Sequence, residues 1–435
     1  MAVCATRTST SIIYYETTTL YDRERYRLRF GADYTYSDHL KAGFELESGS
    51  VDDSANQTLG GTFTKASINV GKVYLQYQPV DWLTAVAGKF SNPWYTTTDM
   101  VYSFDLNPEG GAELLSFHLP LDGGSPAIRD PKDVKRISVA SGSDSYLDVG
   151  LTAVQYIYVN SNEGTFPANF NNNDVMIIGN QIPITWKINH DLLFKVAPGF
   201  TFYTGGGNTD FDSGVPTNTG SPTAVTTGGT SPTVTLGTAN SAVDPVFFSP
   251  READDHAVLS APGELNFNIE GVPFRPYWDF EWNTEGKKRI QDVYLDPTAS
   301  APSSGTAASV ASQNRALGDN LAWALGLQVG QNKRKGDWSG LIEFRQIGLG
   351  AVDQNINGTD YADSYANQQG FKLSTAYNFT DFLTGTVTFY DTWDYKRGLY
   401  QSLGGNTATP STGTTQYLVS AKSVQRVQVD LGWKF

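Results

Sequence analysis

The sequence predicts an all-β protein, a transmembrane antiparallel up-and-down β-barrel of about 16 strands. Apolar and polar side chains alternate along most of the chain, and the links between these alternating segments are in turn short and long. A strand of such a barrel turns one face toward lipid and the other toward water, which requires a period of two residues. We expect one domain over residues 1–435.

The C-terminal segment shows the alternation most clearly. One side of an extended chain would carry Val427, Val429, Leu431, Trp433 and Phe435, and the other side Arg426, Gln428, Asp430, Gly432 and Lys434. The terminal aromatic residues suit a membrane boundary. The segment therefore predicts a strand with its apolar face toward lipid; the alternative is the last strand of a soluble β-sandwich.

The same period recurs in residues 23–30, 41–47, 264–270, 275–283, 321–330 and 371–377. Charged residues at every second position, in one strand after another, favour polar faces that line water over polar faces packed in a dry core.

Composition agrees with this fold. The chain is 39% hydrophobic and 17% charged, and nowhere do 18 apolar residues run together, so no transmembrane helix is predicted. Its one cysteine, Cys4, rules out a disulfide framework. The net charge of −14 argues against a nucleic-acid partner. Residues 1–7 lack the pattern of a signal peptide, so we expect a mature or engineered start.

The links predict short periplasmic turns and long extracellular loops. Short links fall at residues 37–39, 79–81, 189–191, 271–272, 333–336 and 379–381. Long links fall at about 50–66, 91–110, 160–173, 206–255, 285–318, 351–367 and 396–417. Of these, 206–255 and 285–318 are the longest, and the composition of the first cannot build a core.

The strand count follows from direction. If the last strand ends on the periplasmic side, residues 23–36 run inward and need an outward strand before them, for which 8–17 is the candidate. This makes 16 strands. The stretch 119–145 is ambiguous, and a separate hairpin around 136–141 would make 18.

Several segments resemble the putative-porin family of Gram-negative bacteria. They are Gly88-Lys-Phe-Ser-Asn-Pro-Trp94, Thr98-Asp-Met-Val-Tyr102, Asp105-Leu-Asn-Pro-Glu-Gly110, Asp22-Arg-Glu-Arg-Tyr-Arg-Leu-Arg-Phe-Gly31 and Lys41-Ala-Gly-Phe-Glu-Leu-Glu-Ser-Gly49. The resemblance implies a channel for general diffusion of ions and small hydrophilic solutes, in the bacterial outer membrane, in contact with lipid and lipopolysaccharide. It also implies a homotrimer, which is common among general porins.

By the same resemblance, loop 91–110 takes the position of the inward-folded constriction loop, between the fifth and sixth strands. Its acidic residues are Asp99, Asp105 and Glu109. We expect them to face a basic wall and set up a transverse field. The alternative is an ordinary surface loop.

The basic wall is predicted from Arg23, Arg25, Arg27 and Arg29, which share one face of a strand. Facing lipid, each would cost about 2–4 kcal/mol at mid-membrane, so we expect them to line the pore. Arg23 has the alternative of lying among headgroups. Lys41, Lys72 and Lys89 are expected beside them on the next strands.

An acidic wall is predicted from residues on polar strand faces: Glu45, Glu47, Glu264, Glu270, Asp279 and Glu281. Separately, Asp353, Asn355 and Asn357 match the first half of a calcium loop, but the twelfth position is Ser364 and no helices are predicted beside it. A loop-bound calcium and a turn rich in Asn and Gly both remain open. No other cofactor is expected.

We expect no enzyme activity, because none of the common hydrolase, metalloprotease or phosphate-binding motifs occurs. Two other functions stay open. A substrate-specific channel for anions or saccharides would use the arginine row or lumen tyrosines, and a non-conducting adhesin or scaffold barrel would have a plugged interior.

Overall fold

The computed structural model describes residues 24–49, 56–59, 65–121, 145–159, 175–204, 225–226, 233–234, 256–290, 318–354, 356–396 and 423–433. Antiparallel strands dominate these residues, which confirms the prediction of an all-β protein. The expected strand at 8–17, the hairpin at 136–141, and Cys4 and Arg23 lie outside the described residues.

The described strands form one 18-stranded antiparallel sheet and two short pairs. The pairs are β1 (Arg25–Arg27) with β4 (Asn56–Thr58), and β13 (Val225–Thr226) with β14 (Thr233–Val234). The large sheet holds β2 (Arg29–Ser37), β3 (Leu40–Ser48), β5 (Ile68–Val80), β6 (Leu83–Lys89), β7 (Glu109–Pro120), β8 (Tyr146–Val159), β9 (Val175–Gln181), β10 (Ile184–Lys187), β11 (Leu192–Val196), β12 (Gly199–Thr204), β15 (Ala257–Ser260), β16 (Gly263–Ile269), β17 (Val272–Asn283), β18 (Leu321–Gly330), β19 (Trp338–Ile347), β20 (Gln368–Asn378), β21 (Leu383–Asp394) and β22 (Ser423–Trp433).

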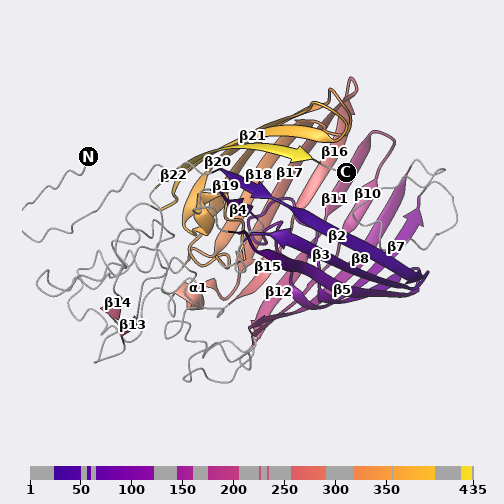
Figure 1. Cartoon of the computed structure of the whole chain (residues 1–435), viewed down its shortest axis with the longest axis horizontal. Helices are drawn as coiled ribbons and strands as arrows, with labels where there is room; N and C mark the ends of the chain where they lie inside the picture. The colour runs from indigo at the N-terminus through magenta and orange to yellow at the C-terminus, as the bar shows by residue number, and fades with distance from the viewer. Residues whose placement is uncertain are drawn as a thin grey trace, which may run out of the picture.

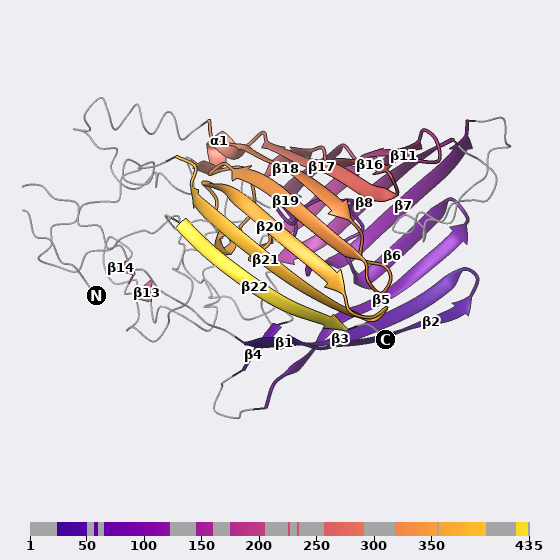
Figure 2. The same cartoon turned by 90° about the horizontal axis from the view of Figure 1, so that it is seen from above.

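Neighbours in the sheet follow chain order, as in an up-and-down barrel, and the sheet is strongly curved (Figures 1 and 2). Successive strands pair from β2 to β8 and from β17 to β22. No pairing between β2 and β22 joins the two ends of the sheet within the described residues.

Three adjacent strands are each split in two by a proline. Pro183 separates β9 from β10, Pro198 separates β11 from β12, and Pro262 separates β15 from β16. Proline has no N–H to give to the ladder. Its carbonyl still accepts, since Ile182 N–H donates to Pro198 O at 2.8 Å and Ala197 N–H to Pro262 O at 2.9 Å. Joining the split strands leaves 15 continuous strands in the large sheet, all within the described chain.

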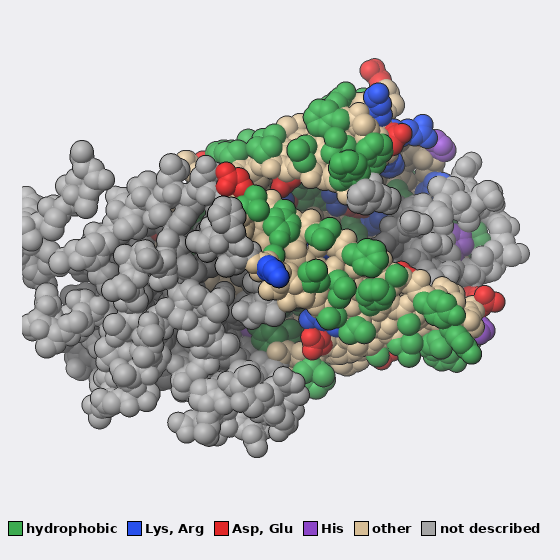
Figure 3. Space-filling view, in the orientation of Figure 1, with side chains coloured by type: hydrophobic (Ala, Val, Ile, Leu, Met, Phe, Trp, Pro, Cys, Tyr) green, Lys and Arg blue, Asp and Glu red, His purple; other side chains and the backbone are tan. Residues whose placement is uncertain are grey.

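The outer face of the sheet is apolar (Figure 3). On β22, Val429 and Leu431 are both 74% exposed, while Arg426 and Gln428 on the opposite side contact residues in the interior. Phe371 and Leu373 on β20, and Val73 and Leu75 on β5, are also exposed. The alternation predicted for these strands therefore sorts apolar side chains outward and polar ones inward.

Short turns join the strands at one end of the sheet, near the positions predicted for them. The β16–β17 turn is Glu270-Gly271, with φ of 51° and 79°, a pattern typical of a tight two-residue hairpin. The prediction for Glu270 is therefore wrong, because this exposed residue lies in the turn and not on the acidic wall.

The other end carries the long links, including helix α1 (Gly286–Arg289), which begins the predicted 285–318 loop. Among the described residues, no helix is both long and apolar enough to cross a membrane. The rest of that loop from 291 to 317, and nearly all of 206–255, lie outside the described residues.

Candidate functional site in the interior of the sheet

Two loops enter the space enclosed by the curved sheet. We name residues 90–108, between β6 and β7, the first inward loop, and residues 348–367, between β19 and β20, the second inward loop; residue 355 of the latter is not described. Buried side chains of both loops belong to the same hydrophobic cluster.

The first inward loop is held by aromatic packing. Trp94 lies 4.8 Å from Tyr102 and 5.8 Å from Tyr156 of β8, measured between ring centroids. Met100 and Val101 are buried in the same cluster. Burial of several large side chains explains why this segment leaves the surface and packs inside.

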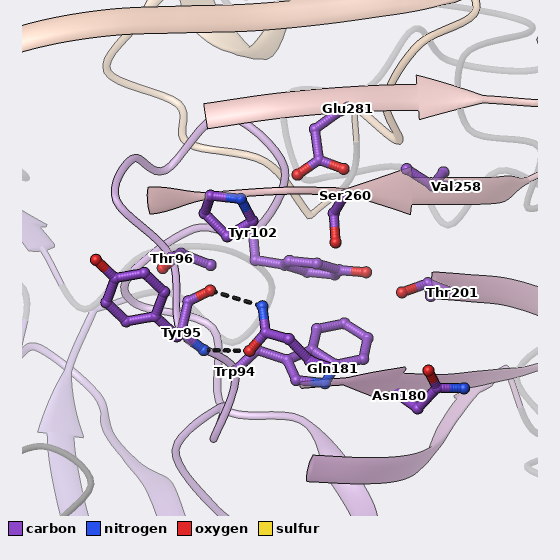
Figure 4. A pocket seen from close by; sticks show the side chains of 11 residues that line it. Trp94, Tyr95, Thr96, Tyr102, Asn180, Gln181, Thr201, Val258, Ser260 and Glu281 are labelled. Carbon is purple, nitrogen blue, oxygen red and sulfur yellow. Dashed lines mark hydrogen bonds between the residues drawn. The ribbon is translucent and has the colours of Figure 1, made fainter. Parts of the chain in front are cut away.

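Polar contacts tie the first inward loop to strands β9 and β17. Gln181 of β9 makes two hydrogen bonds to the backbone of Tyr95, of 2.8 and 2.9 Å (Figure 4). The hydroxyl of Thr97 donates to the Trp278 carbonyl, and that of Thr98 to the Asp279 carboxylate, each at 2.7 Å. The loop therefore reaches from its own strands to the β17 part of the wall.

Arg345 of β19 is the buried centre of these contacts. Its guanidinium lies 2.5 Å from Asp99 and also pairs with Glu343. The ring of Tyr361, from the second inward loop, lies 4.9 Å from the guanidinium. Burial would raise the pKa of the Asp99 carboxyl, but the charges of Arg345 and Lys372 outweigh it and hold the pKa below its usual range.

The arginine row meets the other end of the first inward loop. Arg27 and Arg29 both bond to Asp105, at 2.7 and 2.9 Å, and Arg29 also reaches Glu47 at 3.2 Å. Arg25 lies in β1 opposite Thr58. The predicted arrangement of loop acid against arginine is thus present for Asp105, whereas Asp99 meets a different arginine.

Most of the other predicted basic residues are paired on the inner side. Lys41 bonds to Asp33 at 2.7 Å, and Lys72 to Glu45 at 3.0 Å. Register places both lysines opposite inward residues.

Lys89 and Glu109 correct the sequence prediction. They pair with each other at 2.9 Å, and Lys89 lies opposite Val73, whose side chain is 56% exposed on the outer face. Directly opposed residues point to the same side of a sheet. Lys89 and Glu109 therefore belong to the outer face near the strand ends, and not to the interior.

The acidic residues of β16 and β17 are buried. Glu264 pairs with Arg275 and, at 3.3 Å, with Lys195. Asp279 and Glu281 lie toward the C-terminal end of β17, where Thr98 of the first inward loop bonds to Asp279. The two acidic residues are 3% and 4% exposed. Only Glu264 of the three has a basic partner among the described residues.

The second inward loop corrects the prediction of an extracellular loop at 351–367, because its buried side chains pack in the interior. Asp353 accepts hydrogen bonds from Tyr158 of β8 and Tyr203 of β12, at 2.9 and 3.1 Å. Its Asp360 bonds to Gln428 of β22 at 2.7 Å. The only sequence signal was its pair of tyrosines, Tyr361 and Tyr365, which are both 2% exposed.

The calcium half-motif lies in this loop. One oxygen of Asp353 is already shared by two tyrosine hydroxyls, and Asn357 donates to the Ser364 carbonyl at 3.2 Å. Asn355 lies outside the described residues. No three His, Cys, Asp or Glu side chains converge as a metal-ligand group in the part of the chain that the structure describes.

The two loops also bond to each other through their backbones. The N–H of Gly358 donates to the Asp99 carbonyl, and the N–H of Ser103 to the Ile356 carbonyl, each at 2.7 Å. A side chain at position 358 would collide with Asp99, so glycine permits this approach.

A curved antiparallel sheet with an apolar outside, charged inner walls and inward loops resembles the outer-membrane β-barrels. A family model described as Putative porin matches residues 2–239, more than half of the chain. The protein therefore belongs to the putative-porin family. No curated protein matches the chain.

Solved structures show similarity at low identity. Wzi of Escherichia coli, described as an outer-membrane carbohydrate-binding β-barrel involved in group 1 capsule assembly, is 9% identical with a TM-score of 0.40. The match covers 85% of this chain and 64% of that one, so this chain spans under two thirds of the Wzi chain. OmpT of Vibrio cholerae is 10% identical with a TM-score of 0.33, over 85% of each chain.

Proposed function

We propose that the protein is an outer-membrane porin through which ions and small polar solutes diffuse passively. The observation that carries this proposal is the sorting of side chains, with exposed Val429 and Leu431 on the outside and ion pairs such as Arg29–Asp105 on the inside. If the charged side chains faced the lipid instead, each arginine or lysine would destabilise the folded protein by about 2–4 kcal/mol at mid-membrane.

The two inward loops would narrow the passage. Asp105 of the first loop lies beside Arg27 and Arg29 with all three side chains partly exposed, at 28–34%. Opposite charges held in contact on water-facing walls create a local transverse field, which orients dipolar solutes. This pairing supports weak charge selectivity and not a high-affinity site.

The proposal includes the cellular setting. The exposed apolar belt suits the acyl chains of the bacterial outer membrane, and the ends of the strands suit lipopolysaccharide headgroups. We further propose a homotrimer, the state that is common among general porins.

A substrate-specific channel for anions or saccharides is the second candidate. It is favoured by cations stacked on interior tyrosines: Lys195 on Tyr95, Arg275 on Tyr277 and Lys372 on Tyr390. Flat rings beside fixed cations suit sugars or carboxylates. A non-conducting scaffold is the third candidate, favoured by the packing of both inward loops across the interior.

Planar bilayer recording separates the three functions. Conductance that rises in proportion to bulk salt, without saturation, supports general diffusion. Block by a low concentration of one anion or sugar supports the specific channel. Absence of conductance from correctly folded protein would reject both channels in favour of the scaffold.

The arginine row supplies a sharper test. Replacing Arg25, Arg27 and Arg29 with Ala should shift the reversal potential in a salt gradient toward cation preference, because positive charge is removed from the water column. Lys89→Ala is the control, since that lysine lies on the outer face and should leave the reversal potential unchanged. An unchanged potential in the triple variant rejects the row as pore lining.

A further inference from the structure

The short turn between β18 and β19 differs in charge from the other short turns. It carries Lys333, Arg334 and Lys335 in succession, all three exposed, and we name these residues the basic turn. The other short turns in the described chain each hold an acidic residue and no lysine or arginine; they lie at 37–39, 79–81, 189–191, 270–271 and 379–381. In a chain with a net charge of −14, the basic turn is a local concentration of positive charge at the strand ends.

Two carboxylates shape the basic turn through its backbone. Asp337 accepts hydrogen bonds from the N–H groups of Lys333 and Arg334, at 2.9 and 3.0 Å. Asp381 of the next turn accepts one from the N–H of Lys335 at 2.7 Å. None of the three basic side chains forms an ion pair with a described residue. Three cations beside two carboxylates leave a net positive charge, and the exposed side chains can reach an anion.

Aromatic side chains lie on the outer face just beyond the basic turn. Trp338 and Tyr377 are directly opposed in the β19–β20 register and are 53% and 47% exposed. Phe379 packs on Tyr377, with 5.3 Å between the ring centroids. Trp and Tyr are enriched where lipid headgroups meet acyl chains, so this row is typical of a membrane boundary.

An apolar groove of about 450 Å³ follows these rings on the outer face, across β18 to β21, which lie side by side (Figure 2). We name it the outer groove. Its volume falls within the range of about 300–1,000 Å³ that is typical of ligand pockets. The side chains that line it are apolar except for Ser374 and Thr375, and they include Leu327, Ile342, Leu373 and Val387.

Gly340 gives the outer groove its depth. This residue lines the groove, and a Cβ added to it would meet no atom within 4 Å. It follows Trp338 by two residues and therefore points to the same face, about 7 Å further along the strand at about 3.3 Å per residue. The basic turn, the aromatic row and the outer groove thus follow one another along β19.

We propose that the basic turn and the outer groove together bind one anionic glycerophospholipid. From the strand ends inward, the outer face presents cations, then aromatic rings, then an apolar groove. A phospholipid presents its phosphate, its glycerol esters and its acyl chains in the same order. The basic side chains would bond to the phosphate, and an acyl chain would lie in the groove beside Gly340. An anionic headgroup is favoured over phosphocholine, whose own cation the basic turn would repel.

This inference rests on the membrane setting of the proposed function and not on conduction. The two can therefore fail separately. A protein that conducts ions but binds anionic and zwitterionic phospholipids equally would overturn this inference alone. A protein that binds anionic phospholipid selectively but does not conduct would overturn the channel alone.

Lipid titration followed by native mass spectrometry tests the site in the full chain folded in detergent. We expect the first molecule of phosphatidylglycerol to bind about tenfold more tightly than phosphatidylcholine, because of the basic turn. In the triple variant Lys333→Gln, Arg334→Gln and Lys335→Gln, this preference should disappear. Lys287→Gln with Lys288→Gln is the control, since these exposed lysines lie in α1 at the other end of the sheet and their loss should leave the preference unchanged.

Gly340→Leu tests the outer groove with the basic turn intact. The position has open space and no positive φ, so a leucine should fold there and fill the groove. We expect phosphatidylglycerol to bind about tenfold more weakly, because the acyl chain loses apolar contacts. If this variant fails to fold, the wild-type preference and the triple variant still decide.

Four results would overturn the proposal. The first is equal affinity of the wild type for the two lipids, and the second is a preference that survives in the triple variant or is lost in the α1 control. The third is phosphatidylglycerol binding that Gly340→Leu leaves unchanged. The fourth is a wild-type oligomer that Gly340→Leu dissociates, which would assign the outer groove to a second copy of the chain.

Discussion

The two inward loops reach the same interior from opposite parts of the sheet, but their sequences look different. The first carries Trp94, Met100 and Tyr102, so its burial follows from apolar side chains. The second is rich in Asp, Asn and Gly and reads as an exposed loop, yet Leu349, Ala351 and Ala362 are all fully buried. A polar segment can thus be as deeply buried as an aromatic one.

The difference lies in how the polar groups are satisfied. The first loop is stabilised mainly by packing of its apolar side chains. The second loop is stabilised mainly by hydrogen bonds to residues from distant parts of the chain. Tyr158 and Tyr203 donate to Asp353, and the loop backbone bonds to Asp99 and Ser103. Buried polar groups are tolerated when they are hydrogen-bonded, and these partners come from two distant strands and from the first inward loop. The amino-acid composition of a loop therefore does not by itself decide whether the loop lies inside or outside the sheet.

Arg345 should show the largest effect, because it contacts both loops. We expect Arg345→Met to lower the free energy of unfolding by about 3–5 kcal/mol, since Asp99 and Glu343 would be left without their shared cation. Urea or thermal unfolding measures this. Adding Asp99→Asn and Glu343→Gln to the same variant should recover part of the loss, and an unchanged midpoint in Arg345→Met would contradict a structural role for the pair.

Tyrosine truncation compares the loops directly. Tyr102→Ala in the first loop and Tyr361→Ala in the second should each cost about 3 kcal/mol, because both rings are buried in one cluster. Phe344→Leu on the lipid-facing side is a control for a general loss of aromatic area. If Tyr361→Ala costs under about 0.5 kcal/mol, the second loop behaves as an exposed segment and the comparison fails.

Acid should act on the first loop through Asp99. Its pKa in the folded protein is held below the usual value of 3.8, so the carboxylate stabilises the fold above that pH and loses its contribution as the pH falls through the lowered pKa. The stability difference between wild type and Asp99→Asn, measured from pH 7 down to 2.5, should stay constant to about pH 4 and then shrink. A difference that disappears near pH 6 would contradict this assignment.

Asp105 should show the smallest effect on stability. Its pairs with Arg27 and Arg29 are partly exposed, so Asp105→Asn should cost about 0.2–1 kcal/mol. The same variant should shift the reversal potential toward anions, because one negative charge beside Arg27 and Arg29 is removed. Asp105→Asn would then change ion selectivity with little change in stability. This would distinguish the partly exposed contact at Asp105 from the buried contact of Asp99 with Arg345.

The periodic strands could be predicted well because their information is local. On β22, β20 and β18, alternation alone identified the exposed face, and the turn residues marked where each strand stops. A one-residue error in parity has large consequences, as Lys89 shows. Its position next to the inner lysines in the sequence predicts an inward side chain, but Lys89 is three residues from inward Val86, and this odd spacing places it on the outer face.

Other features depended on contacts between distant residues. Nothing near Asp353 in the chain indicates that two tyrosines from β8 and β12 will meet it, and nothing near Asp99 points to Arg345 of β19 over Arg27 of β1. The splitting of three neighbouring strands at Pro183, Pro198 and Pro262 likewise becomes one structural feature only when the strands are aligned.

By itself, the sequence determined an all-β antiparallel fold, the outward direction of its apolar side chains and the positions of its short turns, because a period of two residues and turn chemistry act within a few residues. Only the tertiary structure decided which loops enter the interior and which charges meet there. Those choices depend on satisfying buried polar and charged groups with partners up to hundreds of positions away, and such partners become neighbours only once the sheet has curved.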